Sequence, residues 1–374
     1  MIIQSYLATG NKETQRKTFE VKVYKAIIEP HPDPEVHSIE LCRIGDYISI
    51  VKKNQIKPND LVAYLPEASI VPAPIVEALG LTGKLFGPDK NRIKAIKLRK
   101  VLSQGLVYVA PHNAWIEGQD VQEELGITKW EPPIPPALRG AVGNGGLGFT
   151  FDVENIKKNP NIFQDGEEVI FTEKIHGTCF IATLYPKDLR REDMIEGKLA
   201  VISKGLGKQN LYFKDIEENA SNVYLRAAKK FNLAKGLDEF FVNSIHPIRI
   251  LGEVYGDIQD LKYGYKPGQI DLRVFGLNIN GQYQDWQVLE GVAKELKLPL
   301  VPVLYRGPFS KEVMLEYTKG KETISGDNAH MREGIVIYPV KERIVRDLGR
   351  VILKSVSEDY LLRGNGKEEG TEFN

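Results

Sequence analysis

Short apolar runs separated by turns fill residues 17–112. Segments such as IELCRI, YISIVKK and QGLVYVAP have the two-residue alternation and β-branched content of strands, and Gly45-Asp46 between the first two predicts a hairpin turn. The segment 74–81 (PIVEALGL) has helical spacing instead. About five short strands in about 95 residues predict a small Greek-key barrel of the OB type, a fold that often binds oligonucleotides.

The pattern breaks at 131–148 (EPPIPPALRGAVGNGGLG), where four prolines precede five glycines without any apolar period. This composition is typical of a linker or an exposed loop. The string GNGGLG formally matches the G-x-G-x-x-G dinucleotide fingerprint, but that motif requires a strand before it and a helix after it. Because a proline-rich stretch precedes it, we disfavour a Rossmann fold.

Strand-like runs dominate the remainder, and helical stretches are expected near 216–234, 286–297 and 310–319. The strands are mostly not spaced as βαβ units, which predicts a mixed, mainly antiparallel α+β domain. The expected organisation is an OB-type nucleic-acid-binding domain at 1–130, a Pro/Gly-rich linker at 131–150 and the α+β domain at 151–374. Its Gly- and Glu-rich tail, 364–374, is expected to fray.

Composition narrows the class of protein. The chain has 374 residues, 42% apolar and 27% charged, as expected for a folded protein of more than one domain. Its two cysteines, Cys42 and Cys179, exclude a disulfide scaffold and a Cys₄ zinc site and fit a reducing compartment. No signal-peptide core and no run of 18 apolar residues is present, so we expect a cytoplasmic protein without a membrane segment.

The total charge is balanced, but cations gather at 84–100 (KLFGPDKNRIKAIKLRK), where seven basic residues face one acid, Asp89. In RIKAIKLRK the apolar Ile93, Ile96 and Leu98 alternate imperfectly with the charges. A strand here would turn its apolar side chains inward and its cations outward as a stripe. Taken alone, the stripe is either a solvated strand face or a surface that follows a nucleic-acid backbone.

Candidate chemistry begins at TEKIHGT (172–178), where an apolar run leads into Lys174 and Gly177 follows three residues later. This spacing places an amine where the backbone can turn sharply around a bound ligand. By itself K-x-x-G is a weak signal, and a surface lysine beside a turn is then the more common explanation.

Four downstream strands share one design, a polar residue in or beside an apolar run. They present Ser203 and Lys204 in VISKG, Glu253 in ILGEVYG, Glu333 in REGIVIYP and Lys354 in RVILKSVS. Each of these alone is compatible with a rim residue. Together they suit a nucleoside triphosphate with a divalent metal, because lysines neutralise phosphate oxygens while carboxylates bind the ion or the ribose.

These strings resemble the collinear motifs of the covalent nucleotidyltransferases, which comprise ATP-dependent RNA and DNA ligases and GTP-dependent mRNA capping enzymes. EKIHGT is similar to the nucleophile motif of the RNA ligases in particular. VISKGLG, ILGEVYG, LRVFGL, REGIVIYP and VILKSV resemble the later motifs in the family's order, across about 170–357. The barrel-first domain order resembles an RNA ligase branch that seals nicks having an RNA 3′-OH strand. The resemblance implies an adenylyltransferase domain of the ATP-grasp-like ligase type.

The resemblance also implies a reaction and its residues. Lys174 would attack the α-phosphate of ATP to form lysyl-AMP, AMP would pass to an RNA 5′-phosphate, and the RNA 3′-OH would then displace AMP. Phe275 would stack on adenine, Glu253 would contact the ribose or the metal, Glu333 would help bind Mg²⁺ or Mn²⁺, and Lys354 would neutralise the α-phosphate. Glu173, Ile175, His176, Gly177, Ser203 and Lys204 are expected in the nucleotide site, with Gly177 small to leave room for the nucleotide.

The expected partner is nicked duplex RNA or an RNA-containing hybrid, held through its backbone by Arg92, Lys94, Lys97 and Arg99, and we expect a monomer. Two alternatives stay open. One is a nucleotidyltransferase with another acceptor, such as a DNA ligase or a GTP-dependent capping enzyme, which a comparison of ATP with GTP would separate. The other is a non-catalytic RNA-binding protein, against which retention of the catalytic lysines and glutamates argues.

Two positions depart from the family pattern. Lys204 stands where the second motif usually carries arginine, so the bidentate fork is lost while the charge is kept. Ile352 stands where many relatives have the first lysine of a K-x-K pair in the fifth motif. This leaves Lys354 with Arg350 or Arg343 as the candidate second phosphate-binding cation.

Overall fold

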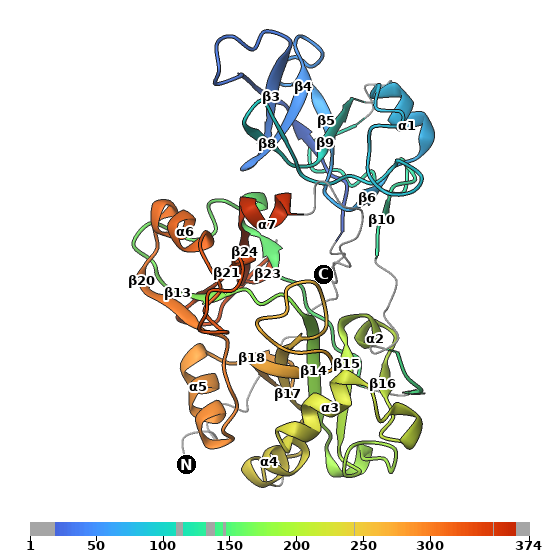
Figure 1. Cartoon of the computed structure of the whole chain (residues 1–374), viewed down its shortest axis with the longest axis vertical. Coiled ribbons are helices and arrows are strands. Elements are labelled where there is room, and N and C mark those ends of the chain that lie inside the picture. Colours follow the sequence, from blue (N-terminus) through green and yellow to red (C-terminus); the bar gives the residue numbers. More distant parts are fainter. Residues whose placement is uncertain are drawn as a thin grey trace.

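The computed structural model describes residues 19–109, 115–131, 139–144, 147–242, 244–346 and 348–363. The chain forms two β-rich domains, the first drawn in blue and teal at the top of Figure 1 and the second in green to red below it. The tail 364–374 and parts of the expected linker, 132–138 and 145–146, lie outside the described residues.

The first domain is a small barrel built from short antiparallel strands. Its strands hydrogen-bond in the orders β1-β5-β9, β2-β3-β4, β7-β8 and β6-β10, with the bounds given next. Its strands are β1 (Val23–Lys25), β2 (Ile27–Pro30), β3 (Ile39–Ile44), β4 (Tyr47–Lys52), β5 (Leu61–Leu65), β6 (Ser69–Ile70), β7 (Ile96–Leu98), β8 (Val101–Ser103), β9 (Leu106–Val109) and β10 (Thr128–Lys129). The hairpin expected at Gly45-Asp46 is present, because Ile44 pairs with Tyr47 and Gly45 has a φ of 57°. Helix α1 (Ala73–Ala78) starts after Pro72 and buries Ile75 and Val76.

The basic stripe is only partly a strand. Ile93 and Ala95 are buried as the alternation predicts, but the regular strand is limited to β7. Arg99 and Lys100 both have positive φ and form the turn into β8. Leu98, expected to point inward, is therefore 43% exposed at the tip of this hairpin. The apolar alternation fails there because a projecting two-stranded hairpin has no core on either face.

The second domain contains two sheets. The seven-stranded sheet has the order β11-β16-β15-β14-β17-β18-β19 and the five-stranded sheet the order β12-β24-β21-β13-β20, with only the β12–β24 pair parallel among these described strands. The first comprises β11 (Val142–Asn144), β14 (Thr178–Leu184), β15 (Leu199–Ser203), β16 (Leu211–Phe213), β17 (Ile248–Gly256), β18 (Ile270–Ile279) and β19 (Gln282–Tyr283). The second comprises β12 (Glu154–Asn155), β13 (Glu168–Glu173), β20 (Val303–Pro308), β21 (Gly334–Pro339) and β24 (Leu353–Val356); β22 (Ile344–Val345) and β23 (Gly349–Arg350) form a separate hairpin. The mixed, mainly antiparallel arrangement agrees with the prediction.

Helices cover both sheets. They are α2 (Lys204–Lys208), α3 (Val223–Lys230), α4 (Leu233–Phe240), α5 (Trp286–Glu295), α6 (Lys311–Thr318) and α7 (Glu358–Leu362), with short 3₁₀ turns at Ile156–Lys158, Lys187–Leu189 and Glu217–Asn219. The single helix expected at 216–234 is two helices, because Asn232 adopts a left-handed conformation between α3 and α4. Tyr224 of α3 stacks on Phe213 of the large sheet, with ring centroids 5.1 Å apart.

One chain segment joins the two sheets. The backbone leaves the five-stranded sheet at Glu173, the end of β13, and enters the seven-stranded sheet at Thr178, the start of β14. Residues 174–177 therefore lie where the two sheets meet.

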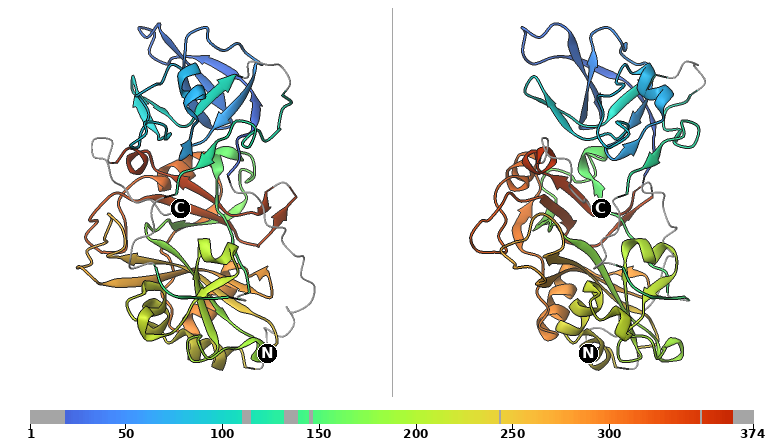
Figure 2. Two further views of the ribbon diagram at one scale, coloured as in Figure 1. Left: turned by 90° about the vertical axis from the view of Figure 1, so that its right-hand side faces the viewer. Right: turned by 45° about the vertical axis from the view of Figure 1, so that its right-hand side comes forward.

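The barrel sits on the end of the second domain that carries α7, as Figures 1 and 2 show from three directions. Lys97 of the projecting hairpin forms an ion pair of 2.5 Å with Glu358 of α7, and Asp46 forms one of 2.7 Å with Lys311 of α6. The Asp46 N–H also donates to the carbonyl of Lys157, at 2.9 Å. Across the described residues, no helix combines the length and apolar content needed to cross a membrane.

Candidate active site

A cavity between the two sheets of the second domain, here named the inner cavity, has an apolar end and a charged end. The apolar end is lined by Phe151, Ile175, Phe275, Val301, Val336, Tyr338 and Ile352. Phe275 of β18 and Phe151 meet edge to face, with ring centroids 5.7 Å apart. The charged end is lined by Asp152, Lys174, Lys204, Glu253 and Lys354. Such a cavity suits a ligand with a flat aromatic part and an anionic part.

Lys174 stands at the junction of the sheets, directly after β13. Its backbone N–H donates to the carbonyl of Gly334 at 3.0 Å, and its Nζ lies 2.7 Å from Oε1 of Glu333. The lysine side chain is 21% exposed and that of Glu333 only 4%. Burial raises the pKa of Glu333 while Lys174 and His176 lower it, and the balance brings it to about 2. The amine is thus held at a fixed point of the cavity rather than in bulk solvent.

Two carboxylate groups beside this amine have unused oxygen atoms. Glu253, on β17 opposite Cys179, has no ion pair or hydrogen bond from its carboxylate to any described residue, and Oε2 of Glu333 is buried without a hydrogen-bond partner. Burial raises the pKa of Glu253 to about 8, with Lys174 opposing this and Glu333 adding to it. Orphaned carboxylate oxygens of this kind fit a divalent cation. Among the described residues no group of three acidic, His or Cys side chains surrounds one point, so such a cation would draw its other ligands from water or phosphate.

Two further lysines face the anionic end of the inner cavity. Lys204 is the first residue of α2, and its Nζ donates to Asp152 Oδ1 at 2.9 Å. Lys354 on β24 is brought alongside by pairing with Val336. Burial lowers the pKa of Lys354, and Asp152 partly opposes this. Burial raises the pKa of Asp152, but the nearby lysines lower it by a larger amount. The net pKa is about 2. The lysines thus concentrate positive charge around one carboxylate.

Three residues expected in the nucleotide site are not among those lining the inner cavity: His176, Gly177 and Ser203. Ser203 Oγ instead caps α2 by accepting from the backbone N–H of Leu206. At Gly177 an added Cβ would lie 2.3 Å from the carbonyl oxygen of Val254. The close approach of β17, rather than room for a ligand, therefore requires glycine here.

His176 is buried behind Lys174 in a polar network. Its Nε2 lies 2.7 Å from Asp260 Oδ1, its Nδ1 lies 2.9 Å from the hydroxyl of Tyr360, and Glu333 Oε2 lies 3.8 Å away. Burial lowers the pKa of His176, but its bonds to these acids outweigh that effect and raise it. The imidazole therefore ties the lysine segment to α7 and to the loop after β17.

Glu173 lines the inner cavity, yet its Oε2 accepts hydrogen bonds from the backbone N–H and the hydroxyl of Thr323. The two arginines suggested as partners of Lys354 are engaged elsewhere. Arg350 bonds Glu342 and stacks on Tyr283, and Arg343 bonds Glu167. The fifth motif therefore contributes one cation, Lys354, to the cavity.

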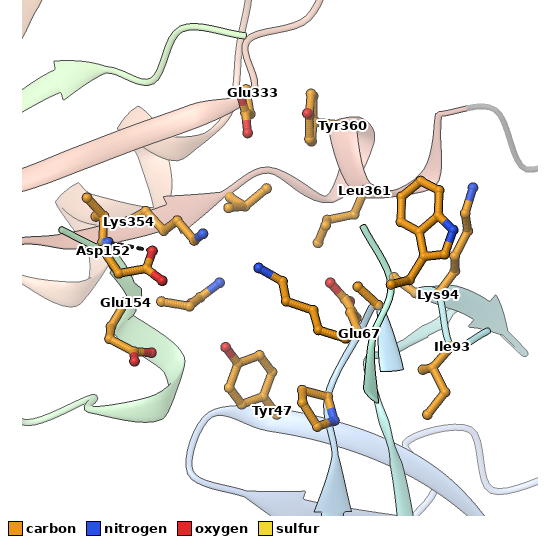
Figure 3. A pocket seen from close by; sticks show the side chains of 18 of the residues that line it. Tyr47, Glu67, Ile93, Lys94, Asp152, Glu154, Glu333, Lys354, Tyr360 and Leu361 are labelled. Carbon is orange, nitrogen blue, oxygen red and sulfur yellow. Dashed lines mark hydrogen bonds between the residues drawn. The ribbon is translucent and has the colours of Figure 1, made fainter. Parts of the chain in front are cut away.

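A second cavity, here named the interdomain cavity, lies between the barrel and the second domain. Figure 3 shows Glu333, Lys354 and Asp152 on one side and Glu67 and Lys94 on the other. Asp152, Lys204 and Lys354 line both cavities, so the two are contiguous.

The four cations expected to contact RNA fall into two pairs. Arg92 lies over the ring of Trp130, 4.0 Å from its centroid, and Lys94 over that of Phe86, and both line the interdomain cavity. Lys97 and Arg99 lie outside it on the exposed hairpin, where Lys97 pairs with Glu358.

Sequence reasoning missed Asp152, Asp260, Tyr360 and Lys129. Asp152 follows the glycine-rich segment, Asp260 lies in a loop, Tyr360 is a helical residue beyond the last motif, and Lys129 belongs to a two-residue strand. None stands in a periodic pattern that would mark it. Their places beside the cavities or beside His176 arise only when distant segments pack together.

Comparisons with known proteins agree with the fold described above. The profile of the RNA ligase family matches residues 167–356, and that of an OB-fold domain matches residues 21–110. Among solved structures, a mutant Naegleria gruberi RNA ligase with ATP and Mn is 23% identical and has a TM-score of 0.73, the match covering 92% of this chain and 98% of that one. The same organism's RNA ligase with pyrophosphate is 24% identical with a TM-score of 0.73, covering the same shares. A comparison with curated protein sequences finds no match.

Proposed function

Because this chain belongs to the RNA ligase family, we propose that it is an ATP-dependent enzyme that seals 3′-OH/5′-phosphate nicks in duplex RNA or an RNA-containing hybrid, with RNA on the 3′-OH side. The observation that carries the proposal is Lys174 Nζ, 2.7 Å from Glu333 and in one cavity with Glu253, Lys204 and Lys354. Structures of the Naegleria enzyme contain ATP, AMP, pyrophosphate or Mn, which supports ATP as the nucleotide substrate and a divalent metal as the cofactor of this chain.

In the first step Lys174 Nζ, as the neutral amine, forms a P–N bond with the α-phosphorus of ATP. The bond to pyrophosphate breaks, and the proton displaced from Nζ passes to water. Adenine fits the apolar end of the inner cavity, against Phe275. Lys354 and Lys204 then lie where the phosphate oxygens carry negative charge. Mg²⁺ or Mn²⁺, held by Glu253 and Glu333, would supply additional positive charge to these oxygens.

In the second step a 5′-phosphate oxygen of RNA attacks the lysyl-AMP phosphorus, and Lys174 leaves and regains its proton. In the third step the RNA 3′-OH attacks the 5′-phosphate, a 3′–5′ phosphodiester forms and AMP leaves. The interdomain cavity gives RNA a route to the same phosphorus, because it shares Asp152, Lys204 and Lys354 with the inner cavity. Arg92 and Lys94 line that route.

The proposal is tested by incubating the protein with α-³²P-labelled ATP or GTP and Mg²⁺ or Mn²⁺. We expect covalent labelling from ATP, no labelling of Lys174→Ala, and normal labelling of Lys208→Ala, which removes an exposed lysine of α2 from outside both cavities. Lys174→Ala should still seal a pre-adenylated RNA nick, since the last step does not use the amine. Labelling that survives Lys174→Ala rejects the assignment, and labelling from GTP in preference to ATP favours a capping enzyme.

A further inference from the structure

A closed network of four side chains joins helix α7 to the segment that carries Lys174. The hydroxyl of Tyr360 lies 2.9 Å from His176 Nδ1, and His176 Nε2 lies 2.7 Å from Asp260 Oδ1. Arg363 Nε donates to Asp260 Oδ2 at 3.2 Å, and the Arg363 guanidinium carbon lies 3.4 Å from the centroid of the Tyr360 ring. Each of the four side chains thus contacts the next, and the last contacts the first.

Contacts, rather than strand register, fix the direction of the His176 side chain, because residues 174–177 cross between the two sheets. The imidazole is 4% exposed, and its two nitrogens meet Asp260 and Tyr360. The Asp260 side chain is 45% exposed, so water competes for its hydrogen bonds. Tyr360 is buried on a helix that Ser357 caps through its hydroxyl. The Tyr360 hydroxyl is therefore the firmer of the two anchors of the imidazole.

The imidazole in turn borders the carboxylate that holds the amine. Glu333 Oε1 lies 2.7 Å from Lys174 Nζ, and Glu333 Oε2 lies 3.8 Å from His176 Nδ1, buried without a hydrogen-bond partner. In a close-packed interior, a rotated imidazole would crowd this oxygen or leave a gap beside it, and the carboxylate would shift in response. Tyr360 and Glu333 both line the interdomain cavity, in the upper part of Figure 3. The Tyr360 hydroxyl is thus separated from the Lys174–Glu333 ion pair by a single imidazole.

We infer that Tyr360 is a positioning residue for the attack of Lys174 on ATP. Its hydroxyl fixes the imidazole of His176, and the imidazole keeps Glu333 and the amine in the reactive geometry. The inference rests on the proposed function. Tyr360 does not line the inner cavity, where adenine and the α-phosphate are placed, so it acts through other residues. Small displacements of reacting groups lower a rate steeply, so the loss of one anchor should be measurable.

The test is the rate of self-adenylation of the full-length chain in the absence of RNA. Tyr360→Phe removes the hydroxyl and keeps the ring on which Arg363 stacks. One hydrogen bond to a buried group predicts a rate at saturating ATP lowered about 10-fold, with the half-saturating ATP concentration changed less than about 3-fold. Tyr305→Phe, which removes a hydroxyl that donates to the carbonyl of Pro308 at 2.8 Å, is the matched control and should label as the wild type does. Urea unfolding should stay cooperative in both variants, so that a slower rate is not a loss of folded protein.

A pair of His176 variants shows whether the hydroxyl acts through the imidazole. Asn places its amide near the position of Nδ1 and keeps a partner for Tyr360, whereas Gln reaches the position of Nε2 and keeps a partner for Asp260. Tyr360→Phe should therefore slow the His176→Asn protein further and leave the His176→Gln protein unchanged. If either His176 variant does not label, the same comparison is made by urea unfolding, in which Tyr360→Phe should destabilise only the Asn variant.

Three results would overturn the inference. They are wild-type labelling by Tyr360→Phe, an equal effect of Tyr360→Phe in the two His176 variants, and a half-saturating ATP concentration that rises as much as the rate falls. Failure of the wild-type protein to label would reject the proposed function as well, whereas normal wild-type labelling with any of the three results would reject the role of Tyr360 alone.

Discussion

Replacing Gly177 with alanine is expected to displace strand β17 and the Glu253 that it carries. The added Cβ would lie 2.3 Å from the carbonyl oxygen of Val254 and 3.0 Å from Cγ of Glu253. Ordinary van der Waals contacts of a Cβ begin near 3.4 Å. The segment 174–177 and β17 must therefore separate by about 1 Å, and the atom in the way is backbone, which cannot rotate aside as a side chain can.

The size of the effect follows from this displacement. Forcing one extra carbon into a packed site lowers the free energy of unfolding by about 1–3 kcal/mol. A shift of about 1 Å between Lys174 and its neighbours costs about 100-fold in rate. We therefore expect Gly177→Ala to lose stability and to self-adenylate about 100-fold more slowly, while the apolar end of the inner cavity, which Gly177 does not line, still accepts adenosine.

Urea unfolding and the rate of labelling with α-³²P-ATP measure the two effects. Gly291→Ala in helix α5 is the matched control, because a Cβ there meets nothing within 4 Å. It should raise stability by up to about 1 kcal/mol and leave labelling unchanged. A Gly177→Ala protein with wild-type stability that fails to bind nucleotide would refute the reasoning and restore the view that glycine makes room for the ligand.

Asp152→Asn is expected to lower the free energy of unfolding by about 2 kcal/mol at pH 7, because the folded-state pKa of Asp152, about 2, lies below the ordinary aspartate value of 3.8. The difference between the two proteins should shrink as the pH falls below about 4, and urea titrations at several pH values would show this. Lys97→Glu should weaken RNA binding, measured by fluorescence anisotropy, without slowing labelling. Adding Glu358→Lys restores the ion pair between the domains with its charges exchanged. If the double variant recovers its RNA affinity, Lys97 acts through the domain contact alone. Chelation with EDTA should abolish labelling and added Mg²⁺ or Mn²⁺ should restore it; labelling that persists would contradict a metal at Glu253 and Glu333.

The site illustrates which residues local pattern can reveal. A charge is conspicuous in or beside an apolar strand, and this is where the sequence places Lys174, Glu253, Glu333 and Lys354. In the structure Lys174, Glu253 and Lys354 line the charged end of the inner cavity. Glu333 does not line it but forms an ion pair with Lys174. Phe275 also lines the inner cavity. His176 follows Lys174 by only two residues, but it lies in the crossing between sheets, where no strand period fixes the direction of a side chain.

The sequence by itself determined the two β-rich domains, their order and the strands that carry the charged residues, because alternation and turn residues act over a few positions. Only the tertiary structure decided that Gly177 faces β17, that Arg350 turns to Glu342, and that Lys129 of the barrel and Lys204 of the second domain line one cavity. These relations depend on how separate sheets and domains pack. Packing brings together residues that are far apart in the chain and share no local signal.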